Sequence, residues 1–166
     1  RDTSGCLLLA KHRPALLAMQ ACLQEKSLTK RYCAVVQGAW PQHVRQMDYP
    51  LKKIHLSNGE RRMRVDPSGK PALTRVRILR AGDRFSSIQL DLVTGRTHQI
   101  RVHCQAEGHP IAGDDKYGDD EFNRMMRRRG VKRLMLHAAC LEFPASDYTQ
   151  ELVINAALPD EFEAYV

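Results

Sequence analysis

One segment of the chain, from Gly95 to His103, combines residue types that could do chemistry. The glycine lets the chain turn tightly, and Thr97 can then begin a helix whose free N–H groups and dipole favour an anion. Arg101 would lie one turn into that helix, so the segment predicts a compact positive site for a carboxylate or a phosphate. From the residues alone, a capped helix with basic side chains on its surface is an equally good interpretation.

The same region contains the candidate metal ligands His98, His103, Cys104 and His109. Five residues turn a helix by about 500°, and an odd spacing puts two side chains on opposite faces of a strand, so His98 and His103 would point apart. The spacings of zinc sites are not met. The sequence has neither a dinucleotide-binding glycine motif nor a P-loop. We therefore expect no metal and no cofactor.

The charge balance is basic, with 26 Lys and Arg residues against 19 Asp and Glu residues and a net charge of +7. Such a balance favours a polyanionic partner such as nucleic acid, although a basic protein without that partner fits it too. No apolar run reaches the roughly 20 residues of a membrane helix, and no signal-peptide pattern opens the chain. Five scattered cysteines without a C-x-x-C motif indicate core residues in a reducing cytoplasm rather than a disulfide framework.

The elements that would position the segment are mostly strands. Residues 85–93 alternate, with Ile88, Leu90 and Leu92 on one face, and the helix that Thr97 begins would end at Gly108. Other strands are expected over residues 6–10, 30–38, 131–138 and 151–154, and helices over 14–26 and 120–129. Turn signals within residues 48–70 predict a basic hairpin. Because strands and helices do not alternate regularly, we expect an α+β fold, with a mixed, mainly antiparallel β-sheet flanked by helices.

Six ordered stretches resemble one known family. They are residues 1–5, 30–36, 69–72, 95–103, 108–118 and 134–138. Together they are similar to the pseudouridine synthases of the ribosomal large subunit class, which modify RNA, and the similarity covers nearly the whole chain. The resemblance implies an enzyme with the pseudouridine synthase catalytic fold and with ribosomal RNA as its partner. A target uridine would be flipped out of the RNA, attacked by an aspartate and rejoined to its sugar through carbon, without a cofactor.

The resemblance also implies where that aspartate should be. The family has His-Arg-Leu-Asp, two variable residues and then an ending that Thr3, Ser4 and Gly5 match. The nucleophile is therefore expected immediately before Arg1. Asp2 falls two positions later, about 6.6 Å further along a strand, which is too far for accurate attack. Asp2 is accordingly not expected to replace it.

Other roles follow from the resemblance by position. Arg101 matches the arginine that pairs with the aspartate, and Tyr32 matches a tyrosine that stacks on the base and assists proton removal. Leu136 or Leu134 matches the apolar wall of the base pocket, although plain core packing is an equal alternative for a leucine. The candidates for contact with RNA are Arg1, Lys70, Arg96, His98, Arg127 and Arg128.

Two alternatives of another class remain. The chain could be a non-catalytic RNA-binding module, including a fragment that is inactive because the aspartate is missing. A DNA-binding regulator is less favoured, because no helix-turn-helix or zinc-finger pattern is evident. For domain organisation, we expect residues 1–166 to form a single catalytic domain, truncated on its N-terminal side and without any upstream RNA-binding domain. We also expect a cytoplasmic monomer that does not enter the membrane.

Overall fold

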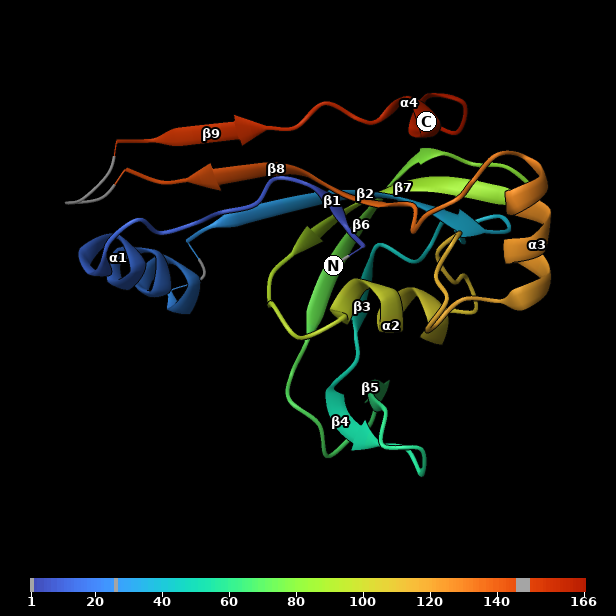
Figure 1. Ribbon diagram of the computed structural model, residues 1–166, viewed down its shortest axis with the longest axis horizontal. Helices are drawn as coiled ribbons and strands as arrows, with labels where there is room; N and C mark the ends of the chain where they lie inside the picture. The colour runs from blue at the N-terminus through green and yellow to red at the C-terminus, as the bar shows by residue number, and fades with distance from the viewer. Residues whose placement is uncertain (1, 26, 146–149) are drawn as a thin grey trace.

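The computed structural model describes residues 2–25, 27–145 and 150–166, and its centre is a seven-stranded sheet (Figure 1). Neighbouring strands follow the order β1-β8-β2-β7-β6-β3, and β9 also pairs with β8. Their bounds are β1 Ser4–Gly5, β2 Thr29–Gln37, β3 Gln46–Asp48, β6 Leu73–Arg80, β7 Phe85–Leu92, β8 Leu136–Phe143 and β9 Leu152–Asn155. The β1–β8 pair is parallel and the other pairs are antiparallel. The expected α+β fold with a mixed, mainly antiparallel sheet is confirmed.

The helices and a separate hairpin surround this sheet. The predicted basic hairpin is present as β4 (Leu51–His55) and β5 (Arg61–Val65). The helices are α1 Arg13–Gln24, α2 Gln99–Ala106, α3 Asp120–Arg128 and α4 Asp160–Glu163. Helix α2 contacts both β5 and β6, so it lies between the hairpin and the sheet, whereas α4 lies on the other side of the sheet (Figure 1).

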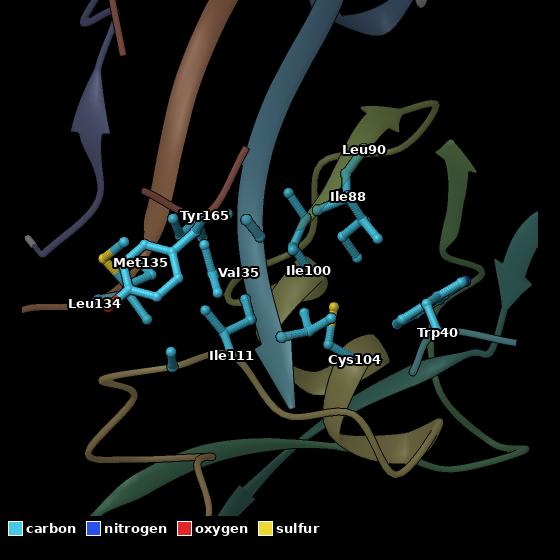
Figure 2. Close-up of a cluster of buried hydrophobic side chains, with 14 of the residues drawn as sticks. Val35, Trp40, Ile88, Leu90, Ile100, Cys104, Ile111, Leu134, Met135 and Tyr165 are labelled. Carbon is cyan, nitrogen blue, oxygen red and sulfur yellow. The ribbon is translucent and has the colours of Figure 1, made fainter. Parts of the chain in front are cut away.

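The core forms around β2, whose residues Ala34, Val35 and Val36 are almost completely buried. Figure 2 shows Ile100 of α2 next to Ile88 of β7. On the opposite face of β7, the ring of Phe85 lies 5.1 Å from that of Tyr165, which follows α4. Both faces of the sheet are therefore covered at β7, by α2 on one side and by the C-terminal residues on the other.

Two predicted strands are wrong in their extent. The strand expected over residues 6–10 is absent. The last bond from the N-terminal segment to β8 runs from the Cys6 N–H to the Ala138 carbonyl, and beyond it Leu7 and Leu9 are 82% and 76% exposed. The physical reason is that β9 pairs with the rest of the β8 edge that β1 uses, so residues 6–10 have no strand left to pair with there. Strand β8 itself begins at Leu136 rather than residue 131, since Met135 bonds irregularly to Ala112 and Val35.

The first helix is confirmed but differs from an ordinary core helix. It begins at Arg13, with His12 accepting the Ala15 N–H through its side chain, and ends at Gln24; Lys26 lies outside the described residues. None of its side chains is buried, and Leu17 is half exposed. It therefore contributes little to the core, and Figure 1 shows it at one end of the molecule. No helix in the described part of the chain is long and apolar enough to cross a membrane.

Candidate active site

A pocket of about 820 Å³ opens where five separate parts of the chain meet. Asp2 and Ser4 enter it from the N-terminal segment, and His98 and Arg101 from the start of α2. The remaining wall consists of the hairpin, residues 132–134, and Gly113, Asp115 and Lys116. Its charged side chains come from segments far apart in the sequence, so the pocket exists only in the folded chain.

Arg101 forms a close, two-pronged ion pair in this pocket. Its Nε and Nη2 donate to the two carboxylate oxygens of Asp114 at 2.7 and 2.6 Å. The arginine side chain is 13% exposed and the aspartate side chain 1% exposed. Burial alone would raise the pKa of Asp114, but hydrogen bonds from Arg101 and from the Tyr117 N–H hold it below its ordinary value. The predicted positive site for a carboxylate is therefore present, and Asp114 occupies the Nε and Nη2 edge of its arginine.

Helix α2 is held in place by polar residues of the same segment. Gln99 accepts the Arg96 N–H and the Thr94 hydroxyl through Oε1, and its Nε2 donates to Thr74 Oγ1 and to the Leu73 carbonyl. Thr97 is not the cap that the sequence predicted. The cap position is His98, which has a positive φ of 55° and makes no capping bond through its side chain. Gln99 instead ties the start of the helix to the residues just before it, through Thr94 and Arg96.

His103 ties the middle of the helix to the sheet and to the segment before the hairpin. Its Nε2 lies 3.1 Å from the Tyr49 carbonyl, and its Nδ1 lies 3.0 Å from Thr74 Oγ1. A carbonyl can only accept, so Nε2 carries the proton and the Thr74 hydroxyl donates to Nδ1. Burial lowers the pKa of His103 below 6.5, which keeps the ring neutral. His103 is thus a structural residue rather than a metal ligand.

His98 reaches the pocket through a strained backbone position. Its Nδ1 lies 2.9 Å from the Tyr117 hydroxyl, whose oxygen also accepts the Met63 N–H of β5 at 3.0 Å. Burial and the positive charges of Arg101 and Lys116 lower its pKa. A left-handed conformation at a non-glycine residue persists only where neighbours enforce it. Tyr117 is one such neighbour.

The base-pocket residues that the sequence predicted are only partly brought together. Leu134 lines the pocket beside Arg101. Leu136 is buried in the main core, and neither it nor Tyr32 is among the described residues that line the pocket. Tyr32 lies on β2, where its Cα is paired with Ala138, the same residue that pairs with Gly5. Burial and the charge of Cys6 raise the pKa of Tyr32.

The predicted RNA contacts are spread over three regions. Lys70 and Arg96 line a second pocket of about 550 Å³, together with Lys52 and Lys53 of the hairpin. Arg127 lies in the last turn of α3, where it pairs with Asp115, and Arg128 is exposed beside it. His98 belongs to the first pocket, and Arg1 lies outside the described residues. Of these groups, His98 lines the first pocket itself, and Arg127 contacts Asp115, which also lines it.

Sequence reasoning gave no role to Asp114, Lys116 or Tyr117, nor to Arg133, which donates to the Ser4 hydroxyl in the pocket wall. Three of them belong to residues 108–118, one of the stretches that carried the family resemblance, so a signal was present. In the part of the chain that the structure describes, no three His, Cys, Asp or Glu side chains gather so as to hold a metal ion.

Comparison with known proteins points in one direction. The family described as RNA pseudouridylate synthase matches residues 1–106. The chain is 47% identical over 163 residues to ribosomal large subunit pseudouridine synthase C of Pasteurella multocida, covering 98% of this chain and 50% of that protein. It is 49% identical over 162 residues to the protein of the same name from Escherichia coli K12, covering 96% and 51%. The chain thus spans about half the length of the curated relatives it matches.

Two solved structures are also similar. Human RNA pseudouridylate synthase domain containing 1 superposes with a TM-score of 0.77 at 33% identity, covering 97% of this chain and 66% of that one. Human RNA pseudouridylate synthase domain containing 4 gives a TM-score of 0.70 at 22% identity, covering 96% and 72%. The second likeness supports the fold alone.

Proposed function

Because the chain belongs to the RNA pseudouridylate synthase family, we propose that it converts uridine to pseudouridine in the RNA of the large ribosomal subunit. The observation that carries the proposal is the buried pair of Arg101 and Asp114 in the pocket entered by the N-terminal segment. In the reaction, the bond between the sugar and N1 of the uracil breaks, the base turns, and C5 forms the new bond and gives up its proton. The relatives' names supply the RNA class.

The proposed nucleophile is an aspartate immediately before Arg1. Asp2, Thr3 and Ser4 line the same pocket as Arg101, which supports a carboxylate reaching the pocket from this side. Asp114 fixes the Nε and Nη2 edge of Arg101, so the arginine would meet the nucleophile with its orientation already set. Asp2 already adds to the negative charge that raises the pKa of Arg101.

Leu134 is the apolar residue best positioned to contact a flipped base in this pocket. Tyr32 stays a proposed stacking residue. It is half-buried on β2, which only β8 separates from β1, and this position is compatible with contact to the base once RNA is bound. Flipping a base costs a few kcal/mol, which contacts to the RNA backbone must offset. Lys70 and Arg96, with Lys52 and Lys53, are the proposed contacts.

The test is release of the C5 hydrogen from uridine in large-subunit RNA, followed as tritium, by a protein extended to include the residue before Arg1. Release is expected from the extended protein and not from one in which that residue is alanine. RNA binding by the folded, extended protein without any release would refute the enzymatic proposal and favour a non-catalytic RNA-binding module. A cytoplasmic location, a monomeric state and the single-domain boundary stay predictions.

Arg101 has its own test. Lysine keeps the positive charge but cannot make the two parallel bonds to Asp114, so Arg101→Lys should lower the rate constant about a hundredfold. Arg124→Lys, at an exposed position of α3, is the matched control. An Arg101→Lys protein that works at the normal rate would remove the arginine from the mechanism.

A further inference from the structure

A short loop, residues 114–117, joins Arg101 to the basic hairpin. At its first residue, the Asp114 carboxylate holds Arg101, and Oδ1 also accepts the backbone N–H groups of Lys116 and Tyr117 at 2.9 Å each. The conformation of the loop and the direction of the arginine are therefore fixed by the same buried carboxylate.

The far side of this loop holds strand β5. Lys116 Nζ donates to the Arg61 carbonyl at 2.6 Å and lies 2.8 Å from the Glu60 carboxylate. The Tyr117 hydroxyl accepts the Met63 N–H at 3.0 Å. A two-stranded hairpin is only marginally stable in water by itself, so such attachments matter for its position. Arg61 and Lys53 are exposed on this hairpin, where an RNA backbone could reach them.

Tyr117 contacts both the hairpin and the catalytic side of the pocket. It is 3% exposed, and the guanidinium carbon of Arg101 lies 5.0 Å from the centre of its ring. Its oxygen accepts from Met63, so its proton can be donated to Nδ1 of neutral His98, 2.9 Å away. The hydroxyl is thus satisfied only while β5 and the start of α2 keep their present separation.

We propose that Lys116 and Tyr117 are positioning residues that couple RNA bound on the hairpin to the orientation of Arg101. This rests on the proposed function, because it takes RNA as the ligand of the hairpin. Neither residue needs to touch the reacting atoms. When RNA holds the hairpin in place, the contacts of Lys116 and Tyr117 hold the loop, and the loop holds Asp114 and Arg101. By reciprocity, a loose loop weakens RNA binding as well.

The first experiment measures the contact itself. Tyr117→Phe removes the hydroxyl and keeps the ring beside Arg101, so amide hydrogen exchange at Met63 should become about fivefold faster. Tyr49→Phe is the matched control, because the Tyr49 hydroxyl bonds to Glu107 and not to the hairpin. Lys116→Met, at a more exposed residue, is a second variant that keeps the aromatic packing intact. Unchanged exchange at Met63 in Tyr117→Phe would overturn the proposal.

The second experiment tests the coupling by RNA affinity, with polyuridylic acid as the probe and the full chain as the protein. Tyr117→Phe should weaken binding about fivefold when the hairpin is native, and by much less when Lys53→Met and Arg61→Met have already removed its exposed charges. In the native chain the NMR signal of the Arg101 Nε–H should shift on adding RNA, and the shift should shrink in Tyr117→Phe. Additive losses of affinity, or an Arg101 signal with the same shift in the variant, would overturn the coupling.

Since neither measurement needs turnover, a failure of hydrogen release would count against the proposed function alone.

Discussion

The Asp114 carboxylate fixes both the direction of Arg101 and the conformation of the loop that follows it. The carboxylate pairs with Arg101 and accepts two backbone N–H groups, and the backbone carbonyl of Asp114 accepts the N–H of Gly118. A buried arginine that loses its partner is left as an uncompensated charge, so the pair is far more sensitive to one change than a surface pair.

Asp114→Asn should therefore lower the free energy of unfolding by about 3 kcal/mol, because the charge of Arg101 stays buried without its counterion. The neighbouring change Asp115→Asn is a matched control. Asp115 is 85% exposed and pairs with Arg127, which is 58% exposed, so its loss should cost less than about 1 kcal/mol. Urea denaturation of the three proteins measures the difference. Equal stability of the two variants would contradict the role given to the buried pair.

His103 makes the stability depend on pH. Its pKa in the folded chain lies below the ordinary value of 6.5, so below that pH the unfolded chain takes up a proton that the folded chain resists. This contribution to stability is fully present above about pH 6.5 and is lost as the pH falls toward the folded-state value. His103→Gln should flatten the pH dependence of the unfolding free energy between about pH 7.5 and 5.5, with exposed His43→Gln as the control. A slope equal to that of the native chain would exclude His103 as its source.

At the scale of elements, local pattern predicted what depends on local physics. The alternation of Ile88, Leu90 and Leu92 predicted β7, and the turn signals predicted the hairpin. The absence of a strand over residues 6–10 could not be predicted from those residues, because the competing strand β9 comes from a distant part of the chain. The choice of Asp114 as the partner of Arg101 is likewise a tertiary event. The resemblance identified Arg101, but no spacing rule joins an arginine to an aspartate thirteen positions later in a loop.

Gly5 shows how closely β1 must approach β8. It has a φ of +100°, and a Cβ there would lie 2.1 Å from the Ala138 carbonyl oxygen. Gly5→Ala should destabilise the fold by about 2–3 kcal/mol, because backbone must move, and should shift the N-terminal segment out of the pocket. Gly59→Ala has a similar φ of +80° with nothing within 4 Å, so it isolates the cost of backbone strain, about 1 kcal/mol. Thermal denaturation and a crystal structure of each variant measure both effects, and an undisplaced β1 in Gly5→Ala would contradict the prediction.

Across the whole molecule, the sheet brings the N-terminal segment, α2 and the loops on the hairpin side to one pocket, while α1 projects from the other end (Figure 1). The basic residues behind the net charge of +7 therefore contribute to RNA binding to different extents, depending on how close they lie to the pocket. Basic residues beside the pocket can hold the RNA that enters it, whereas those near α1 can only add to the long-range field.

That difference can be measured by the salt dependence of RNA binding. Each phosphate neutralised on a single strand contributes about 0.7 to the slope of log affinity against log salt, because bound counterions are released. Lys53→Met with Arg61→Met should therefore lower the magnitude of the slope by about 1.4 if both side chains contact phosphates. Lys11→Met with Arg13→Met removes the same charge from exposed positions at α1 and should leave the slope nearly unchanged. Equal slopes for the two double variants would mean that RNA affinity depends only on net charge. The hairpin would then not be the side of the pocket that binds RNA.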